Sequence, residues 1–188
     1  MTTEAVRDTA VSRRLSLNRL GLWLFILSES MIFLALLTAR VFLEGTDVPE
    51  EADQTIALVI TSVLLLSSGS AYGAEAAAVA GRWRVFSTAM GATLLLGLIF
   101  LVGVGFEWAE ALHAFPPSSA FGTVFFTMTG MHAFHVVTGL VFLLIIFFQA
   151  RRGAYDDGNV WPVEAGVKYW HFVDVVWVFF YPALYLVS

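Results

Sequence analysis

Long runs of apolar residues, each interrupted by only an occasional ionisable group, make up most of this chain. They cover approximately residues 19–42, 55–80, 84–106, 119–149 and 163–187. A helix needs about 20 predominantly apolar residues to cross the hydrocarbon core of a bilayer, and every run meets that length. The pattern therefore predicts an all-α fold: one membrane domain over residues 1–188, with five transmembrane helices that follow a polar arm at residues 1–18.

The composition supports a membrane protein. Apolar residues make up 59% of the chain and charged residues 13%, and the mean hydropathy is +0.79. Soluble domains average about 45–50% apolar and 25% charged residues, so a water-soluble globular domain is excluded. The chain has no cysteine, which excludes disulfides and thiolate-bound metals, and its net charge of −5 argues against a nucleic-acid partner.

The charged residues in and around the connections separate into two groups. The basic group lies at or before the start of the first run, or in and around the second and fourth connections: Arg7, Arg13, Arg14, Arg19, Arg82, Arg84, Arg151, Arg152 and Lys168. The acidic group lies in the first and third connections: Glu44, Asp47, Glu50, Glu51, Asp53, Glu107 and Glu110. By the positive-inside rule, the N-terminus faces the cytoplasm and the C-terminus lies outside. Arg40 is the exception to this separation.

Two further patterns concern the packing of the predicted helices. Trp108, Trp161, Tyr169 and Trp170 fall near predicted helix ends, where aromatic residues commonly anchor a protein at the membrane interface. Gly69 and Gly73 form a small-xxx-small pattern. Such a pattern allows close approach of helices, either within the bundle or in a homodimer.

A few ionisable residues lie within the predicted spans. They are Glu29, Glu75, His132, His135, His171 and Asp174. An ionisable side chain at a helix centre costs at least about 2.5 kcal/mol, so those that remain usually face protein or water. Glu29 lies near the middle of the first span, and two interpretations of it remain open: a carboxyl that exchanges protons or orders water, and a neutral acid hydrogen-bonded between helices.

The histidines have two alternative explanations. His132 and His135 lie three residues apart on one helix face, and His171 and Asp174 repeat that spacing. Histidines from facing helices could ligate a haem, and His with Glu29 and Asp174 could bind a metal. The same residues can equally form hydrogen bonds between helices.

Several motifs resemble those of the cytochrome c oxidase subunit III family of haem-copper oxidases. A long and specific one is Lys168-Tyr-Trp-His-Phe-Val-Asp-Val-Val-Trp177, in the last predicted helix. Four others occur earlier in the chain, in the family's order: Ser28-Glu29, Leu65-Leu-Ser-Ser68, Phe106-Glu-Trp108, and Phe125 to Val137, with the sequence FFTMTGMHAFHVV. Together the motifs include all five predicted helices.

The resemblance implies a non-catalytic core subunit of a prokaryotic terminal oxidase in aerobic respiration, located in the cell membrane. Such a subunit has no active site, haem or copper of its own, and packs against subunit I, which carries haem and copper, reduces oxygen and pumps protons. The family also implies bound phospholipid and support for proton uptake. By motif position, the family's internal polar residues are here Glu29, Glu107, His132, His135, His171 and Asp174. These polar groups are expected to satisfy one another.

The chain also departs from the family pattern. Longer members have seven helices, and this sequence aligns with the last five, so two helices that form one wall of the lipid cleft are not represented. Val104 replaces a family glutamine near Glu107. The alternatives are an accessory subunit of a nitric oxide reductase, and a stand-alone haem- or metal-binding membrane protein that uses His135 and His171. The electron donor, whether cytochrome c, another electron-transfer protein or quinol, is selected by other subunits.

Overall fold

The computed structural model describes residues 3–44, 54–156 and 158–186, with side chains described from residue 12 to residue 43 in the first range. These residues form helices and no strands, which confirms the predicted all-α fold class. The five helices are α1 (Thr3–Glu44), α2 (Gln54–Val79), α3 (Trp83–Ala114), α4 (Ala120–Arg151) and α5 (Trp161–Tyr185).

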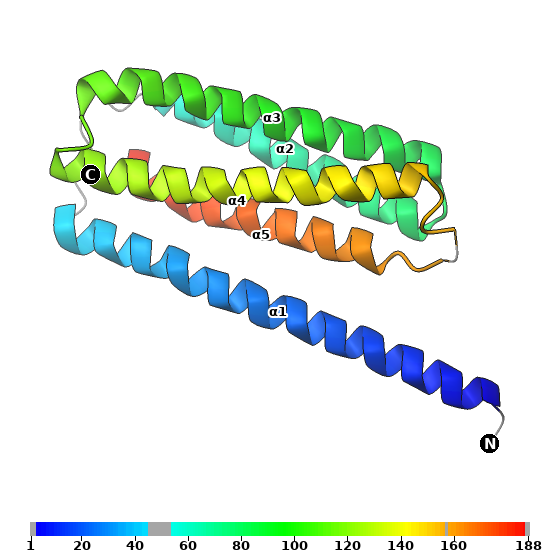
Figure 1. Ribbon diagram of the computed structural model, residues 1–188. Coiled ribbons are helices and arrows are strands. Elements are labelled where there is room, and N and C mark those ends of the chain that lie inside the picture. The colour runs from blue at the N-terminus through cyan, green and yellow to red at the C-terminus, as the bar shows by residue number, and fades with distance from the viewer. Residues whose placement is uncertain (1–2, 45–53, 157, 187–188) are drawn as a thin grey trace.

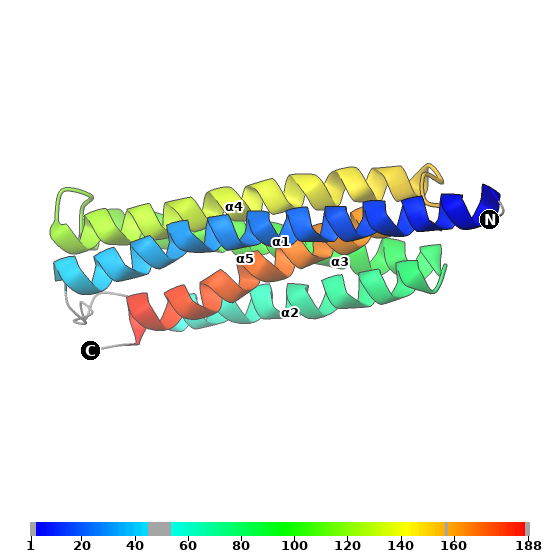
Figure 2. The ribbon, with the colours of Figure 1, turned by 90° about the horizontal axis from the view of Figure 1, so that it is seen from below.

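Four segments of the described chain are long and apolar enough to cross a membrane: Ser12–Leu43, Gln54–Val79, Trp83–Ala114 and Ala120–Arg151. The helix α5 runs beside them through the bundle (Figures 1 and 2). Its apolar side chains Val167, Trp170, Val173 and Trp177 are buried. Lys168, His171 and Asp174 lower its hydropathy. This explains why α5, although it lies inside the bundle, is not among the four segments selected by length and apolar composition.

Several helices extend beyond the apolar runs that predicted them. The first begins at Thr3, so residues 3–18 of the predicted polar arm are part of α1, and α3 continues to Ala114. Hydropathy marks where a helix leaves the hydrocarbon, whereas a helix ends where its backbone hydrogen bonding stops. The acidic connection at residues 45–53 lies outside the described residues.

The bundle consists of four closely associated helices and a more peripheral α1. Within the described chain, α1 contacts α4 and α5, and its N-terminal half leans away from them (Figure 1). The most apolar part of α1 is 11% buried, against 28–33% for the corresponding parts of α2, α3 and α4. The few contacts that attach α1 to the bundle are therefore important for its position.

Glycines allow α3, α4 and α5 to approach closely around one tryptophan. A Cβ atom at Gly97 would lie 2.7 Å from Trp170 Cη2, and one at Gly139 would lie 3.0 Å from Trp170 Cε3. Trp170 and Tyr169 are buried, so the predicted interfacial role is wrong for these two residues. Cβ atoms at Gly69 and Gly73 would meet nothing within 4 Å, so the small-xxx-small pattern lies on an open face of α2.

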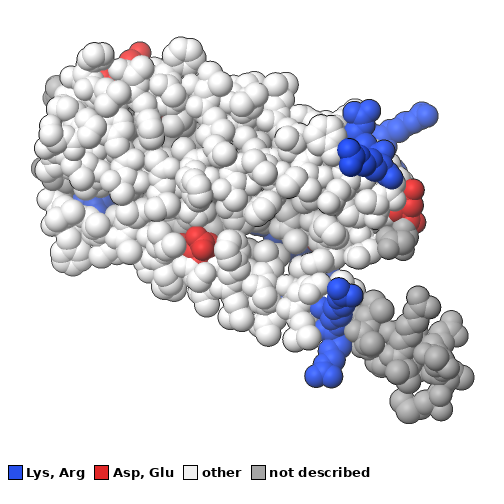
Figure 3. Space-filling view, viewed as in Figure 1, with Lys and Arg blue, Asp and Glu red and all other residues white. Residues whose placement is uncertain are grey.

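The visible Lys and Arg side chains are concentrated at one end of the molecule, where the connections α2–α3 and α4–α5 lie (Figure 3). Arg40, the exception in the sequence, lies near the end of α1 and is 1% exposed. Its guanidinium carbon lies 5.2 Å from the centroid of the Phe121 ring, in a cation–π contact. The exception is therefore a buried packing residue.

Candidate functional site

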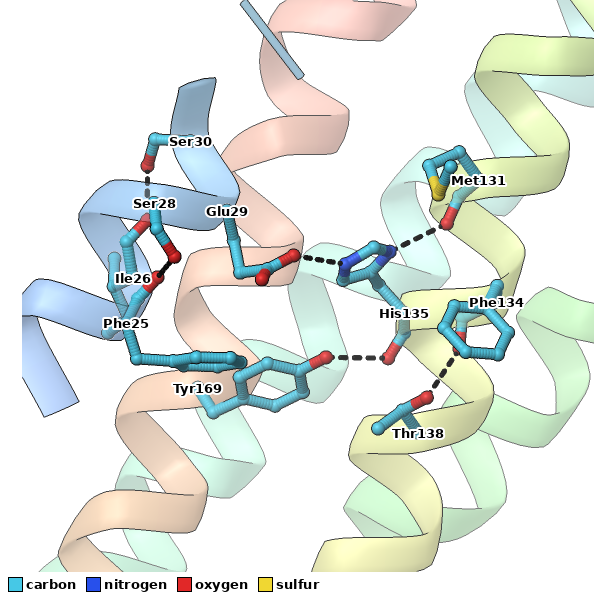
Figure 4. Close-up of polar contacts among 10 residues, drawn as sticks. All are labelled: Phe25, Ile26, Ser28, Glu29, Ser30, Met131, Phe134, His135, Thr138 and Tyr169. Carbon is cyan, nitrogen blue, oxygen red and sulfur yellow. Dashed lines mark hydrogen bonds and ion pairs between the residues drawn. The ribbon is translucent and has the colours of Figure 1, made fainter. Parts of the chain in front are cut away.

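Glu29 and His135 form a polar contact between α1 and α4. The Nε2 atom of His135 lies 3.1 Å from Oε2 of Glu29, and Nδ1 lies 2.8 Å from the backbone oxygen of Met131, one turn earlier in α4 (Figure 4). His135 is 6% exposed, and the Glu29 side chain is 20% exposed. The contact thus joins the peripheral helix to the bundle through a carboxyl and an imidazole.

The geometry fixes the number of protons in this contact. A backbone carbonyl only accepts hydrogen bonds, so Nδ1 of His135 carries a proton and donates it to Met131. A single proton must then lie between Nε2 and the Glu29 carboxyl, either as a neutral acid that donates to the imidazole or as a carboxylate paired with an imidazolium. Both arrangements have no net charge, which lowers the cost of placing the pair inside a membrane.

Aromatic side chains surround the pair. The Phe33 ring meets the His135 ring edge-on at a centroid distance of 4.7 Å, and the ring of the preceding residue, Phe134, lies 5.7 Å from it. The Tyr169 hydroxyl on α5 donates to the backbone oxygen of His135 at 3.5 Å, and the Phe25 ring lies against the Tyr169 ring (Figure 4). Residues of α1, α4 and α5 therefore position this site.

His132 lies in an aromatic pocket. It is fully buried, and its ring centroid lies 4.8 Å from that of Trp177, 5.8 Å from that of Phe100 and 6.3 Å from that of Phe180. Neither ring nitrogen has a hydrogen-bond partner among the described residues. The expectation that each internal polar group is satisfied by another is not met at His132.

His171 and Asp174 face α2 from α5. The Nδ1 atom of His171 lies 2.7 Å from the Ser68 hydroxyl. Asp174 is 3% exposed, and neither of its carboxyl oxygens has a hydrogen-bond partner among the described residues, although the Ser68 hydroxyl is a close polar neighbour. Asp174 is therefore a second group at which the expected mutual satisfaction is not met.

Glu75 pairs with a cation of α5, not with the arginines of the nearby α2–α3 turn. The Lys168 ammonium lies 3.2 Å from Glu75 Oε1 and 3.7 Å from Glu164 Oε2, and Arg19 of α1 lies 3.4 Å from the same Glu164 oxygen. These charges connect α1, α2 and α5 near the end of the bundle that carries most basic residues.

Glu107 forms a separate contact at the opposite end of α3. It is 6% exposed, and Oε1 accepts a hydrogen bond of 2.7 Å from the hydroxyl of Tyr185 on α5. Sequence reasoning did not identify Tyr185, because nothing in local spacing relates a residue near the end of α5 to one near the end of α3. The Glu164–Lys168 contact was detectable from its i,i+4 spacing.

The six residues selected from the sequence thus fall into separate places. Glu29 and His135 meet at the α1–α4 contact, His171 and Asp174 lie at the α2–α5 contact, Glu107 binds Tyr185, and His132 lies among aromatic rings. Within the described residues, no three His, Asp or Glu side chains are grouped so that they could hold a metal ion. Haem ligation by His135 and His171 fits poorly, because both ring nitrogens of His135 are engaged in hydrogen bonds and His171 faces a different helix.

Two apolar grooves border α1. One, of about 350 Å³, lies between α1, α4 and α5 and includes Leu22, Phe25, Phe142 and Tyr169 in its lining. The other, of about 290 Å³, lies between α1 and α5 and is lined by side chains such as Phe33 and Phe179. On α1, Glu29 lies between Phe25, which lines the first groove, and Ser30, which lines the second.

Comparison with known proteins gives a consistent result. A family model described as "Cytochrome c oxidase subunit III" matches residues 2–188. A protein named "Cytochrome c oxidase subunit 3" from Pyricularia grisea is 36% identical over 88% of this chain and 66% of its own length. One of the same name from Synechocystis is 33% identical over 90% of this chain and 76% of its own. "Probable quinol oxidase subunit 3" from Staphylococcus aureus is 32% identical over 92% of this chain and 90% of its own.

Proposed function

Because the chain belongs to the cytochrome c oxidase subunit III family, we propose that it is a non-catalytic core subunit of a prokaryotic haem-copper terminal oxidase. The match of the family model to residues 2–188 carries this proposal. The chain spans about two thirds of the length of the fungal relative and nine tenths of the staphylococcal one. The names of the relatives include both cytochrome c and quinol oxidases, so the proposal is for a terminal oxidase with its donor selected elsewhere in the complex.

We propose that the chain packs against the catalytic subunit I through apolar faces of its outer helices. Large apolar side chains are exposed along these faces, for example Leu24 and Leu34 on α1 and Leu95 and Leu98 on α3. In a membrane, such faces are compatible with both lipid and protein neighbours. The open face of α2 at Gly69 and Gly73 also permits a close approach by a second helix.

The pair Glu29–His135 gives the proposed subunit a proton-handling group. One proton is shared between two bases whose other contacts are fixed, so the pair can take up or release a proton with little movement of the helices. We assign it the support of proton uptake by the complex, and we assign Glu107, His132, His171 and Asp174 to the internal polar framework. No covalent step is assigned to this chain.

Lipid is the proposed occupant of the two grooves beside α1. Their linings are almost entirely apolar, which suits acyl chains, and Arg19 lies in the same helix toward the basic end of the bundle. Cationic side chains at that end suit anionic lipid headgroups. We also propose that this end faces the cytoplasm of a prokaryotic cell, as the distribution of Lys and Arg predicts.

A tag on this chain tests the assignment. Purification in mild detergent should recover a haem- and copper-containing catalytic subunit of the oxidase class, together with phospholipid. Recovery of a nitric oxide reductase would contradict the oxidase assignment. A stoichiometric haem Soret band on the purified single chain that disappears in His171→Ala would contradict the non-catalytic role.

A further inference from the structure

The contact surface between α2 and α5, here called the α2–α5 seam, carries a series of polar groups that continues into the bundle. The series begins near the basic end with Glu164, Lys168 and Glu75, and continues with the hydrogen bond between His171 and Ser68. Asp174 follows His171 by three residues on α5. From Glu164 to Asp174 the helix rises about 15 Å, so the series reaches the middle of a bilayer.

Two tryptophans hold the seam together on either side of Asp174. Trp170 donates its indole N–H to Ser67 at 3.1 Å, and Trp177 donates to Thr61 at 2.9 Å. Because both bonds join α5 to α2, they fix the two helices about one turn before and one turn after Asp174. The carboxyl group therefore has a defined position in a closely packed part of the seam.

Asp174 differs from the other polar side chains of α5 that face the bundle. Trp170, Trp177 and Tyr185 each donate a hydrogen bond to a side chain of another helix. Asp174 is equally buried, and yet neither of its oxygens has a hydrogen-bond partner among the described residues. A buried carboxylate without partners costs several kcal/mol, so burial favours an acid that holds its own proton.

We propose that Asp174 is a proton-exchange site, reached from the basic end of the bundle through the polar groups of the α2–α5 seam. The side chains that would carry the proton are the His171 imidazole and the Ser68 hydroxyl, which both donate and accept hydrogen bonds. This proposal goes beyond the framework role given to Asp174 above. It does not depend on the oxidase assignment, because its readout is a property of this chain's own carboxyl group.

The transfer is balanced in protons. An imidazolium at His171 donates its Nδ1 proton to Ser68 Oγ, and Ser68 passes its original hydroxyl proton to an oxygen of Asp174. The products are a neutral imidazole, an intact hydroxyl and a neutral carboxylic acid. The reverse sequence returns the proton to His171, and the partly exposed Lys168–Glu75 pair is the proposed point at which the seam meets the interfacial water.

Other titratable groups surround α5 and take no part in the His171–Ser68–Asp174 transfer itself. They are Arg19, Glu29 and Arg40 on α1, Glu75 on α2, Glu107 on α3, His132 and His135 on α4, and Glu164, Lys168, Tyr169, Tyr181 and Tyr185 on α5 itself. Glu29 and His135 are bonded to each other, and Glu107 accepts from Tyr185. Of the groups on this list and His171, His171 is the one that hydrogen-bonds to Ser68, the polar neighbour of Asp174, in the described structure.

Infrared spectroscopy of the complex purified through this chain tests the proposal. Transfer from light to heavy water should shift a carboxylic-acid C=O band that is lost in Asp174→Asn and retained in Glu29→Gln. Ser68→Ala should leave the band in place and slow its hydrogen–deuterium exchange roughly tenfold. This is the effect expected when the activation free energy rises by about the net energy of one hydrogen bond. Ser68→Thr keeps the hydroxyl and should restore the rate.

Ser70→Ala is the matched control. Ser70 lies on the same helix, but its hydroxyl bonds to Thr93 on α3, so its removal should leave the exchange rate unchanged. If Ser68→Ala does not accumulate, His171→Phe removes the preceding group and should slow the exchange to a similar extent. The proposal is overturned if no band depends on Asp174, or if the Ser68→Ala and His171→Phe complexes exchange as fast as the Ser70→Ala complex.

Discussion

His135 and Glu29, on helices that are not neighbours in the sequence, share one proton across a distance of 3.1 Å. The donation from Nδ1 of His135 to Met131 orients the ring and leaves Nε2 for the carboxyl. Since α1 is the least buried of the four helices with an apolar segment long enough to cross a membrane, this contact has two consequences: it attaches α1 to the bundle, and it places an exchangeable proton at the edge of the protein.

The first prediction separates these consequences. In Glu29→Gln, the amide N–H can still donate to Nε2 of His135, so the subunit should assemble and the haem content of the complex should stay normal. The shared proton is lost, so the number of turnovers before inactivation should fall. Haem content and the decay of oxygen consumption measure the two effects, and an unchanged decay would leave the pair with a packing role alone.

A complementary variant tests the attachment of α1. Glu29→Ala removes the partner of a nearly buried imidazole nitrogen, which should destabilise the folded chain by about 1–3 kcal/mol. Thermal unfolding in detergent measures the loss. Ser28→Ala serves as the control, because the Ser28 hydroxyl donates to Phe25 within its own helix, and equal losses in the two variants would show that the contact with His135 does not attach α1.

The α2–α5 seam yields a second test of an individual hydrogen bond. Thr61→Val keeps the shape of the side chain and leaves the buried indole N–H of Trp177 without its acceptor, so the free energy of unfolding should fall by about 1–3 kcal/mol. Thr138→Val is the matched control, since the Thr138 hydroxyl donates to Phe134 of its own helix. Similar unfolding midpoints for the two variants would contradict the assigned bond.

The sequence predicted the helical bundle because long apolar runs have few other folded forms in a membrane. It predicted the family because the motif from Lys168 to Trp177 is long and continuous. It also selected Glu29 from its position near the middle of the first apolar run, and left its role open. These inferences depend on local properties of the chain, namely hydropathy and the order of residues.

The partners of these residues could not be predicted in the same way. The Glu29–His135 contact depends on which face of α1 meets α4, and the Tyr185–Glu107 bond depends on the relative shift of α3 and α5. Helix spacing placed His132 beside His135, and yet one is hydrogen-bonded between helices and the other lies among aromatic rings. Tertiary packing determines which of two neighbours on one face meets a polar partner.

The connection between α4 and α5 provides a prediction about pH. The Tyr155 hydroxyl donates to Gln149 Oε1 at 2.6 Å, and burial raises the pKa of Tyr155 above its ordinary value of 10.0. The folded state then holds this proton more tightly than the unfolded state, so stability should be constant below pH 10 and should decrease as the pH rises above it. Unfolding midpoints measured across the alkaline range test this, and Tyr155→Phe should flatten the decrease. An equally steep decrease in Tyr155→Phe would assign it to another group.

The membrane orientation leads to a further expectation. With the basic end of the bundle in the cytoplasm, alkaline phosphatase fused after Ser188 should be active, because that enzyme matures only outside the cytoplasm. A fluorescent protein fused at the same place should be dark. An inactive phosphatase together with a bright fluorescent protein would reverse the proposed orientation.

Two glycine positions distinguish packing within the bundle from packing against a partner. Gly97→Ala would place a methyl group 2.7 Å from both the Trp170 ring and Leu140 Cδ2, and overpacking of this kind should lower the free energy of unfolding of the isolated chain by about 1–3 kcal/mol.

Gly73→Ala meets open space, so the isolated chain should be unaffected or stabilised by up to about 1 kcal/mol through the better helix propensity of alanine. If the open face of α2 contacts another subunit, Gly73→Ala should nevertheless lower the recovery of the catalytic subunit through the tagged chain. Unchanged recovery would assign that face to lipid, and a large loss of stability in isolated Gly73→Ala would contradict the packing described here.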